Sequence, residues 1–131
     1  MPTAELPEIA AAVDGLPGGD GLDVLVLHGS RARGDAGPAS DWDFGYLARD
    51  EVDPVALLAA LVDVLHTDAV DLVDLAAASA LLRFRAARDG VLVLERRPDA
   101  FLSFRLEAVT FWCDAGTAIR AAQADVMSSL G

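Results

Sequence analysis

The sequence has a single cysteine, Cys113, in 131 residues. An intrachain disulfide and a thiol-built zinc cluster are therefore excluded. Basic residues are also scarce, ten against twenty-one acidic ones, for a formal net charge of −11. This charge argues against a broad nucleic-acid-binding face and against docking on an anionic membrane, and it favours solubility, a basic protein partner or a metal-bound substrate.

Long apolar runs are missing as well, since none approaches the roughly twenty residues of a membrane span. The N-terminal segment "MPTAELPEIAAAVDGL" carries acidic residues and lacks the basic flank of a signal peptide. We therefore expect one cytoplasmic domain over residues 1–131, large enough to bury a core.

Apolar spacing alternates between helical and strand patterns along the chain. The first helix carries its apolar residues at positions 6, 9, 13 and 16. The spacing then predicts strands over 22–28 and 41–47, a helix over 54–66, a strand over 69–77, a helix over 79–88, a strand over 90–95, and two helices from 99 onward, broken near 114–116. This order predicts an α/β (α+β) fold with a small mixed sheet. The sheet is partly antiparallel, because the connection between the first two strands is short, and helices flank it.

Two of the predicted helices have a defined apolar face. In the 54–66 helix the expected buried face consists of Val55, Leu58, Leu61, Val62 and Leu65. The first helix after residue 99 carries a mostly aromatic stripe, made of Phe101, Phe104, Ala108, Phe111 and Trp112. Such a stripe is more often core, and its alternative role is to dock a partner.

Asp41 and Asp43 lie two residues apart on a predicted strand. Their side chains would leave the same face, with Cα atoms about 6.6 Å apart, and Trp42 would point into the core. Two carboxylates so placed repel each other unless a cation lies between them, and Mg²⁺ prefers oxygen ligands. A solvated strand end is the structural alternative.

Gly29 and Ser30 follow the first predicted strand. A glycine there permits a tight turn, and the N–H groups after it could meet phosphate oxygens. Arg31 and Arg33 add positive charge suited to phosphate, although they could instead pair with acids such as Asp35. The stretch lacks the Gly-Lys-Ser/Thr ending of a Walker loop.

A third acid for this site would come from "VDLVDL". Asp71 and Asp74 are three residues apart, so on a strand they face opposite sides. Only one of them can join the face that carries Asp41 and Asp43, and periodicity alone does not choose.

Gly-Ser, ten residues, Asp-x-Asp and a later acid together resemble the active-site signature of the DNA polymerase beta-like nucleotidyltransferase superfamily. In a chain this short, "GSRARG…SDWD…VDLVDL" is similar to the minimal nucleotidyltransferase (MNT) proteins, the partners of HEPN-domain toxins in toxin–antitoxin pairs. The resemblance covers residues 28–75 well and the rest more loosely. It implies the nucleotidyltransferase fold, with the helices from about residue 99 available for partner docking.

The resemblance also assigns roles to residues. It gives Gly29 and Ser30 the nucleotide phosphates, with Arg31 and Arg33 beside them. It makes Asp41 and Asp43 ligands of two Mg²⁺ ions and needs a third carboxylate, which we assign to Asp71 rather than Asp74. The position before Gly-Ser is usually aromatic or aliphatic in the family. Here it is His28, which we interpret as a strand-end histidine with satisfied hydrogen bonds.

MNT antitoxins are described as transferring AMP from ATP to a tyrosine of the HEPN toxin, which blocks its RNase site. The resemblance therefore implies an ATP-using protein adenylyltransferase with a HEPN toxin as partner. Two alternatives stay open. One is an antitoxin that acts by stoichiometric binding; the other is a small-molecule nucleotidyltransferase, which usually needs a further domain to hold the acceptor.

Overall fold

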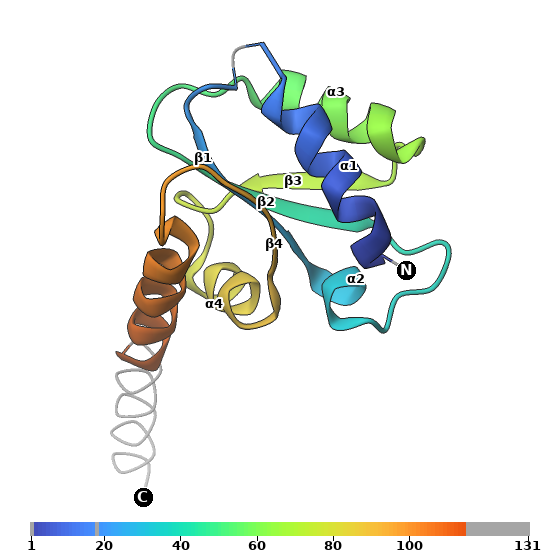
Figure 1. Cartoon of the computed structure of the whole chain (residues 1–131). Helices are drawn as coiled ribbons and strands as arrows, with labels where there is room; N and C mark the ends of the chain where they lie inside the picture. Colours follow the sequence, from blue (N-terminus) through green and yellow to red (C-terminus); the bar gives the residue numbers. More distant parts are fainter. Residues whose placement is uncertain (1, 18, 115–131) are drawn as a thin grey trace, which may run out of the picture.

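A computed structural model describes residues 2–17 and 19–114, with side chains described from residue 6 onward. The elements (Figure 1) run in the order α1 (Pro2–Asp14), β1 (Leu22–His28), α2 (Gly29–Arg33), β2 (Trp42–Ala48), α3 (Pro54–Leu65), β3 (Val70–Asp74), α4 (Ala80–Asp89) and β4 (Val91–Glu95). A further helix spans residues 100–114 and is called the 100–114 helix below. Every predicted element up to residue 114 is present, with small shifts at the ends, and the turn expected at Gly29 and Ser30 forms the short helix α2. The second helix predicted after the break near 114–116 lies outside the described residues.

The four strands form one sheet in the order β3-β2-β1-β4. Strand β1 pairs antiparallel with both β2 and β4, whereas β2 and β3 are parallel because α3 carries the chain back between them. The predicted mixed, partly antiparallel sheet is therefore confirmed. All seven residues of β1 are buried, as is usual for a central strand, including two polar residues: His28 and Asp23, whose carboxylate pairs with Arg97.

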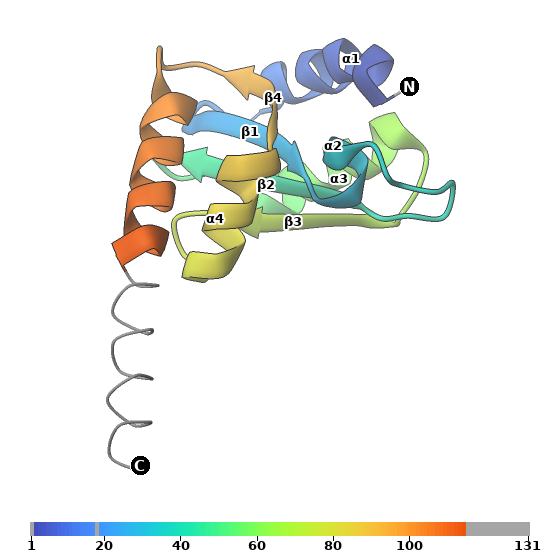
Figure 2. The same cartoon turned by 90° about the horizontal axis from the view of Figure 1, so that it is seen from below.

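Helices cover both faces of the sheet (Figure 2). Helices α1 and α3 pack on one face, where Leu25 and Leu27 of β1 point. Helix α4 and the 100–114 helix lie on the other, where the alternate residues Val24 and Val26 point. Because side chains alternate along a strand, His28 lies on the same face as Val24 and Val26, the face that α4 covers.

Helix α3 begins where predicted, and its buried face is shifted from the predicted one, with which it shares Leu61. The Asp53 carboxylate caps it by accepting hydrogen bonds from the N–H groups of Val55 and Ala56. Leu57 and Leu61 are fully buried, while Val55 is 75% exposed, so its assignment to the core face is wrong. Two neighbouring stripes of this apolar helix satisfy the 3.6-residue period. Contact with the sheet and α1 selects the stripe that contains both Leu57 and Leu61.

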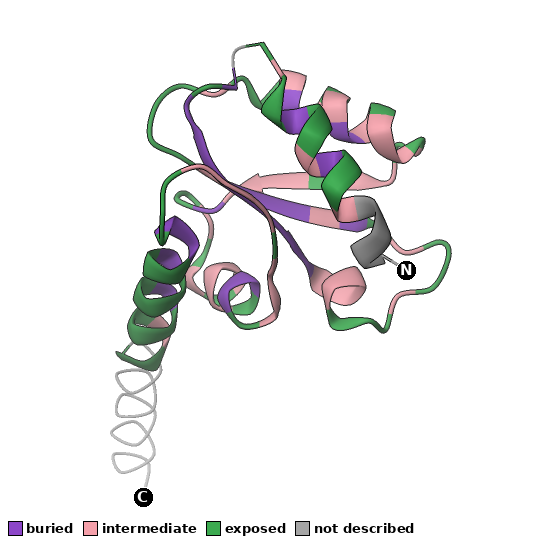
Figure 3. Cartoon of the chain, viewed as in Figure 1, coloured by how far each residue is buried: buried purple, intermediate pink, exposed green. Residues whose placement is uncertain are grey.

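The predicted aromatic stripe is largely core. Phe101, Phe104 and Ala108 are buried against the sheet, which excludes them from partner docking (Figure 3). Trp112 is half-buried and stacks on Phe84 of α4, with ring centroids 5.5 Å apart. Phe111 alone of the stripe is exposed.

No helix in the described ranges combines the length and the hydropathy that crossing a bilayer requires.

Candidate functional site

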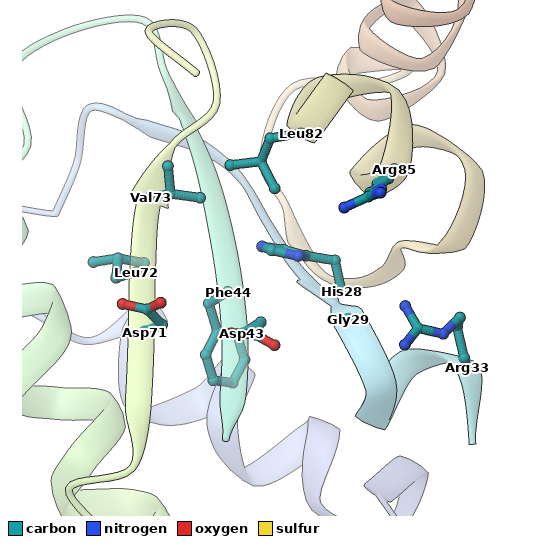
Figure 4. Close-up of a pocket in the computed structure, with 10 residues that line it drawn as sticks. All are labelled: His28, Gly29, Arg33, Asp43, Phe44, Asp71, Leu72, Val73, Leu82 and Arg85. Atoms are coloured by element: carbon teal, nitrogen blue, oxygen red, sulfur yellow. The ribbon is translucent and has the colours of Figure 1, made fainter. Parts of the chain in front are cut away.

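A cavity of about 470 Å³ opens where β1 ends and where β2 and β3 begin. It lies on the α4 face of the sheet, and α4 forms one of its walls (Figure 4). The lining residues are His28, Gly29, Arg33, Asp43, Phe44, Asp71, Leu72, Val73, Leu82 and Arg85. Four of the seven residues predicted for the site are among them: Gly29, Arg33, Asp43 and Asp71.

Asp43 and Asp71 are direct partners across the parallel strands β2 and β3. Neighbouring strands lie about 4.8 Å apart, so the two carboxylates leave adjacent positions on one face. Asp74 instead pairs with Tyr46 on the opposite face, where it helps burial raise the pKa of the tyrosine. The register of β3 therefore brings Asp71 to the cavity and keeps Asp74 away from it.

Asp41 lies one residue before β2, is exposed, and does not line the cavity. Its charge still acts on Asp43, which places it near the carboxylate pair. Among the described residues, no three His, Cys, Asp or Glu side chains are gathered closely enough to hold a metal ion as they stand. The structure thus brings two of the three predicted carboxylates together.

The Asp43 carboxyl is electrostatically strained. Burial raises its pKa above the ordinary value of 3.8, and the charges of Asp71 and Asp41 raise it further. His28 and Arg33 oppose this rise. A cation beside Asp43 and Asp71 would relieve the repulsion, so the donor set fits a hard divalent ion.

Gly29 makes room for the Asp43 carboxylate. Its φ of +72° lies in the left-handed region, and a Cβ added there would overlap Asp43 Oδ2 and lie 3.2 Å from Cγ. Only glycine permits both the turn and this close approach. Ser30 follows in the first turn of α2, half-buried and outside the cavity lining.

The two predicted arginines have different surroundings. Arg31 turns away from the cavity: its guanidinium donates to the Ser40 carbonyl at 2.8 and 3.1 Å and lies 4.2 Å over the Trp42 ring. It therefore braces the loop before β2. Arg33 lines the cavity and pairs weakly with Asp35, at 3.3 Å, as the structural alternative anticipated.

His28 differs from its interpretation as a satisfied histidine. The residue is only 8% exposed, and its Nε2 has no hydrogen-bond partner. The ring projects into the cavity from the end of β1 (Figure 4). Burial lowers its pKa, although the neighbouring charges of Asp43 and Asp71 act in the opposite direction.

Leu82 and Arg85 are cavity residues that the sequence did not reveal. Both belong to α4, which follows β3 along the chain, and no motif marks them. Figure 4 shows Arg33 and Arg85 on one side of the cavity, with Asp43 and Asp71 toward the other. This division into a cationic and an anionic side suits a ligand that carries both phosphates and cations.

Comparison with known proteins identifies a family that this chain matches and a protein that it resembles. The family described as "Polymerase beta, Nucleotidyltransferase" matches residues 16–99. The protein adenylyltransferase MntA of Aphanizomenon flos-aquae (strain 2012/KM1/D3) is 33% identical over 96 residues, which cover 64% of each chain. The match thus spans slightly less than two thirds of that relative.

Solved structures extend the likeness over almost the whole chain. A structure of a tri-AMPylated HEPN toxin of Shewanella oneidensis in complex with MNT antitoxin matches with a TM-score of 0.68 and 26% identity, covering 97% of this chain and 99% of the matched chain. A toxin–antitoxin structure with AMP-PNP matches with a TM-score of 0.69 and 27% identity, with the same coverage. Because the family match extends over most of the chain and contains the whole cavity, this protein belongs to the polymerase beta nucleotidyltransferase family.

Proposed function

We propose that this protein is an antitoxin that transfers AMP from ATP to a HEPN-family toxin. The observation that carries the proposal is the side-by-side placement of Asp43 and Asp71 at the Gly29 turn, within one cavity. The relatives support it, since one is named a protein adenylyltransferase and another is an MNT antitoxin bound to an AMPylated HEPN toxin.

Asp43 and Asp71 would hold Mg²⁺, and Asp41 would join them by rotating its exposed side chain toward the cavity. Carboxylate oxygens are the ligands that Mg²⁺ takes, and such an ion would offset the repulsion that Asp71 and Asp41 add to the effect of burial in raising the pKa of Asp43. When bound, two Mg²⁺ ions stabilise the attacking and leaving oxygens of an in-line displacement at phosphorus.

The chain's own residues would position ATP and the acceptor. Arg33 and Arg85 face the carboxylates and suit the triphosphate, and Gly29 lines the same cavity. Asp71, which is exposed, would take the proton of the attacking hydroxyl. A bond forms from that oxygen to the α-phosphorus, the bond to the β-phosphate breaks, and pyrophosphate leaves. This use of ATP fits the cytoplasm.

Intact-mass spectrometry of the toxin tests the proposal. Incubating the toxin with this protein, ATP and Mg²⁺ should add one or more AMP groups to it, and Asp43→Asn or Asp71→Asn should prevent the addition. Asp74→Asn is the matched control, because it removes a nearby charge on the opposite face. Neutralisation of the toxin without any mass change would instead identify a stoichiometric antitoxin.

A further inference from the structure

Besides its buried aromatic face, the 100–114 helix has a second apolar face, which is exposed to solvent. Leu102, Leu106 and Val109 are 52%, 62% and 38% exposed. Their spacings of four and three residues place them on one side of the helix, in the pattern that packs one helix against another. Figure 3 shows most of the outer surface of this helix as exposed.

This face is presented on a firmly held helix. Phe101, Phe104 and Ala108 anchor its other side in the core. The three exposed side chains therefore cannot turn inward without removing those anchors from the sheet. Contiguous exposed apolar side chains on a fixed element are typical of an interaction surface.

The same helix adjoins the wall of the cavity. Trp112 stacks on Phe84, and the Arg83 guanidinium lies 5.5 Å over the Phe104 ring, so the helix is joined to α4. Helix α4 in turn supplies Leu82 and Arg85 to the cavity. A protein bound on the exposed face of the 100–114 helix would lie beside the element that forms one wall of the site.

The part of this chain that each relative matches indicates which protein binds this face. The catalytic family matches up to residue 99, immediately before the helix begins. The antitoxin bound to a HEPN toxin instead matches 97% of this chain, which includes the helix. The helix is thus absent from the catalytic family match and present in an antitoxin solved with its toxin.

We propose that Leu102, Leu106 and Val109 form the docking face for the HEPN toxin. A toxin bound there would present its acceptor residue to the cavity. The inference rests on the proposed function, because it identifies the toxin as the acceptor. The partner surface should be an apolar helical face with a basic rim, since this chain carries a net charge of −11.

The test separates docking from catalysis. The double variant Leu102→Glu/Leu106→Glu should weaken toxin binding at least about a hundredfold and abolish AMP transfer. Each substitution would bury a carboxylate in the interface with the toxin. Binding of ATP to the isolated variant, measured by calorimetry, should stay within about twofold of wild type, since neither leucine lines the cavity. Val55→Glu is the matched control: Val55 is 75% exposed on α3, across the sheet, and its variant should bind toxin normally.

Asp43→Asn supplies the opposite separation, because it should lose AMP transfer while keeping toxin binding. If the wild-type protein bound the toxin but transferred no AMP to it, the proposed function would fail while docking still stood. Wild-type toxin affinity of the double leucine variant would overturn the docking proposal. So would a wild-type chain that is dimeric in gel filtration and becomes monomeric in the leucine variant, since the face would then belong to a second copy.

Discussion

Replacing Gly29 with alanine should damage catalysis far more than stability. A Cβ at this position would overlap Asp43 Oδ2, the carboxylate that lies beside Asp71. The carboxylate is the end of a flexible side chain, so it would move rather than the backbone. The variant should therefore fold with its proposed metal ligand displaced.

The magnitudes follow from the geometry. An L-residue at a φ of +72° costs about 1–2 kcal/mol, and overpacking at the Asp43 carboxylate adds about 1 kcal/mol. The free energy of unfolding should fall by about 2–3 kcal/mol in total. Restoring ordinary van der Waals separation moves Oδ2 by about 1 Å, and a displacement of this size at a reacting centre costs on the order of a hundredfold in rate.

Gly34→Ala is the matched control, because Gly34 also has a left-handed φ, +82°, and its added Cβ would meet nothing within 4 Å. Its unfolding free energy should fall by about 1–2 kcal/mol, with the rate of AMP transfer unchanged. Urea unfolding measures the stabilities, and the initial rate of toxin modification measures activity. In an Asp43→Ala background the extra cost of Gly29→Ala over Gly34→Ala should disappear. Equal rates for the two glycine variants would refute the reasoning.

Three further predictions concern the site and the core. Asp71→Asn should lower the rate of AMP transfer at least about a hundredfold, whereas Asp74→Asn, on the other face of β3, should leave the initial rate within about threefold. Burial raises the folded-state pKa of Asp43, so this group favours folding below its ordinary value of 3.8 and loses that contribution as pH rises through the raised pKa. Asp43→Asn should accordingly melt higher than wild type at pH 7 without divalent cations, an advantage absent in acid; a lower melting temperature at pH 7 would contradict this. Leu61→Ala should lower the free energy of unfolding, measured in urea, by about 2–5 kcal/mol because Leu61 is fully buried. Val55→Ala should change it by no more than about 0.5 kcal/mol because Val55 is exposed.

Much of the fold was accessible from local pattern. The largely apolar segment 22–28 predicts a strand, and it forms the buried strand β1 inside the sheet. Alternation around Trp42 predicts that this ring is buried while Asp43 faces the other way, and the structure agrees. These predictions hold because the periods of strands and helices are properties of the backbone itself.

What periodicity leaves open is the relation between elements. The sequence by itself determined the order of helices and strands, the mixed sheet, and the assignment of Gly29 and Asp43 to one site. Tertiary structure decided that Asp71 rather than Asp74 meets Asp43, because β3 aligns with β2 in one register. It also brought Arg85 into the cavity, since α4 packs across the sheet. Local spacing fixes which side chains share a face, but only packing between elements fixes which faces meet.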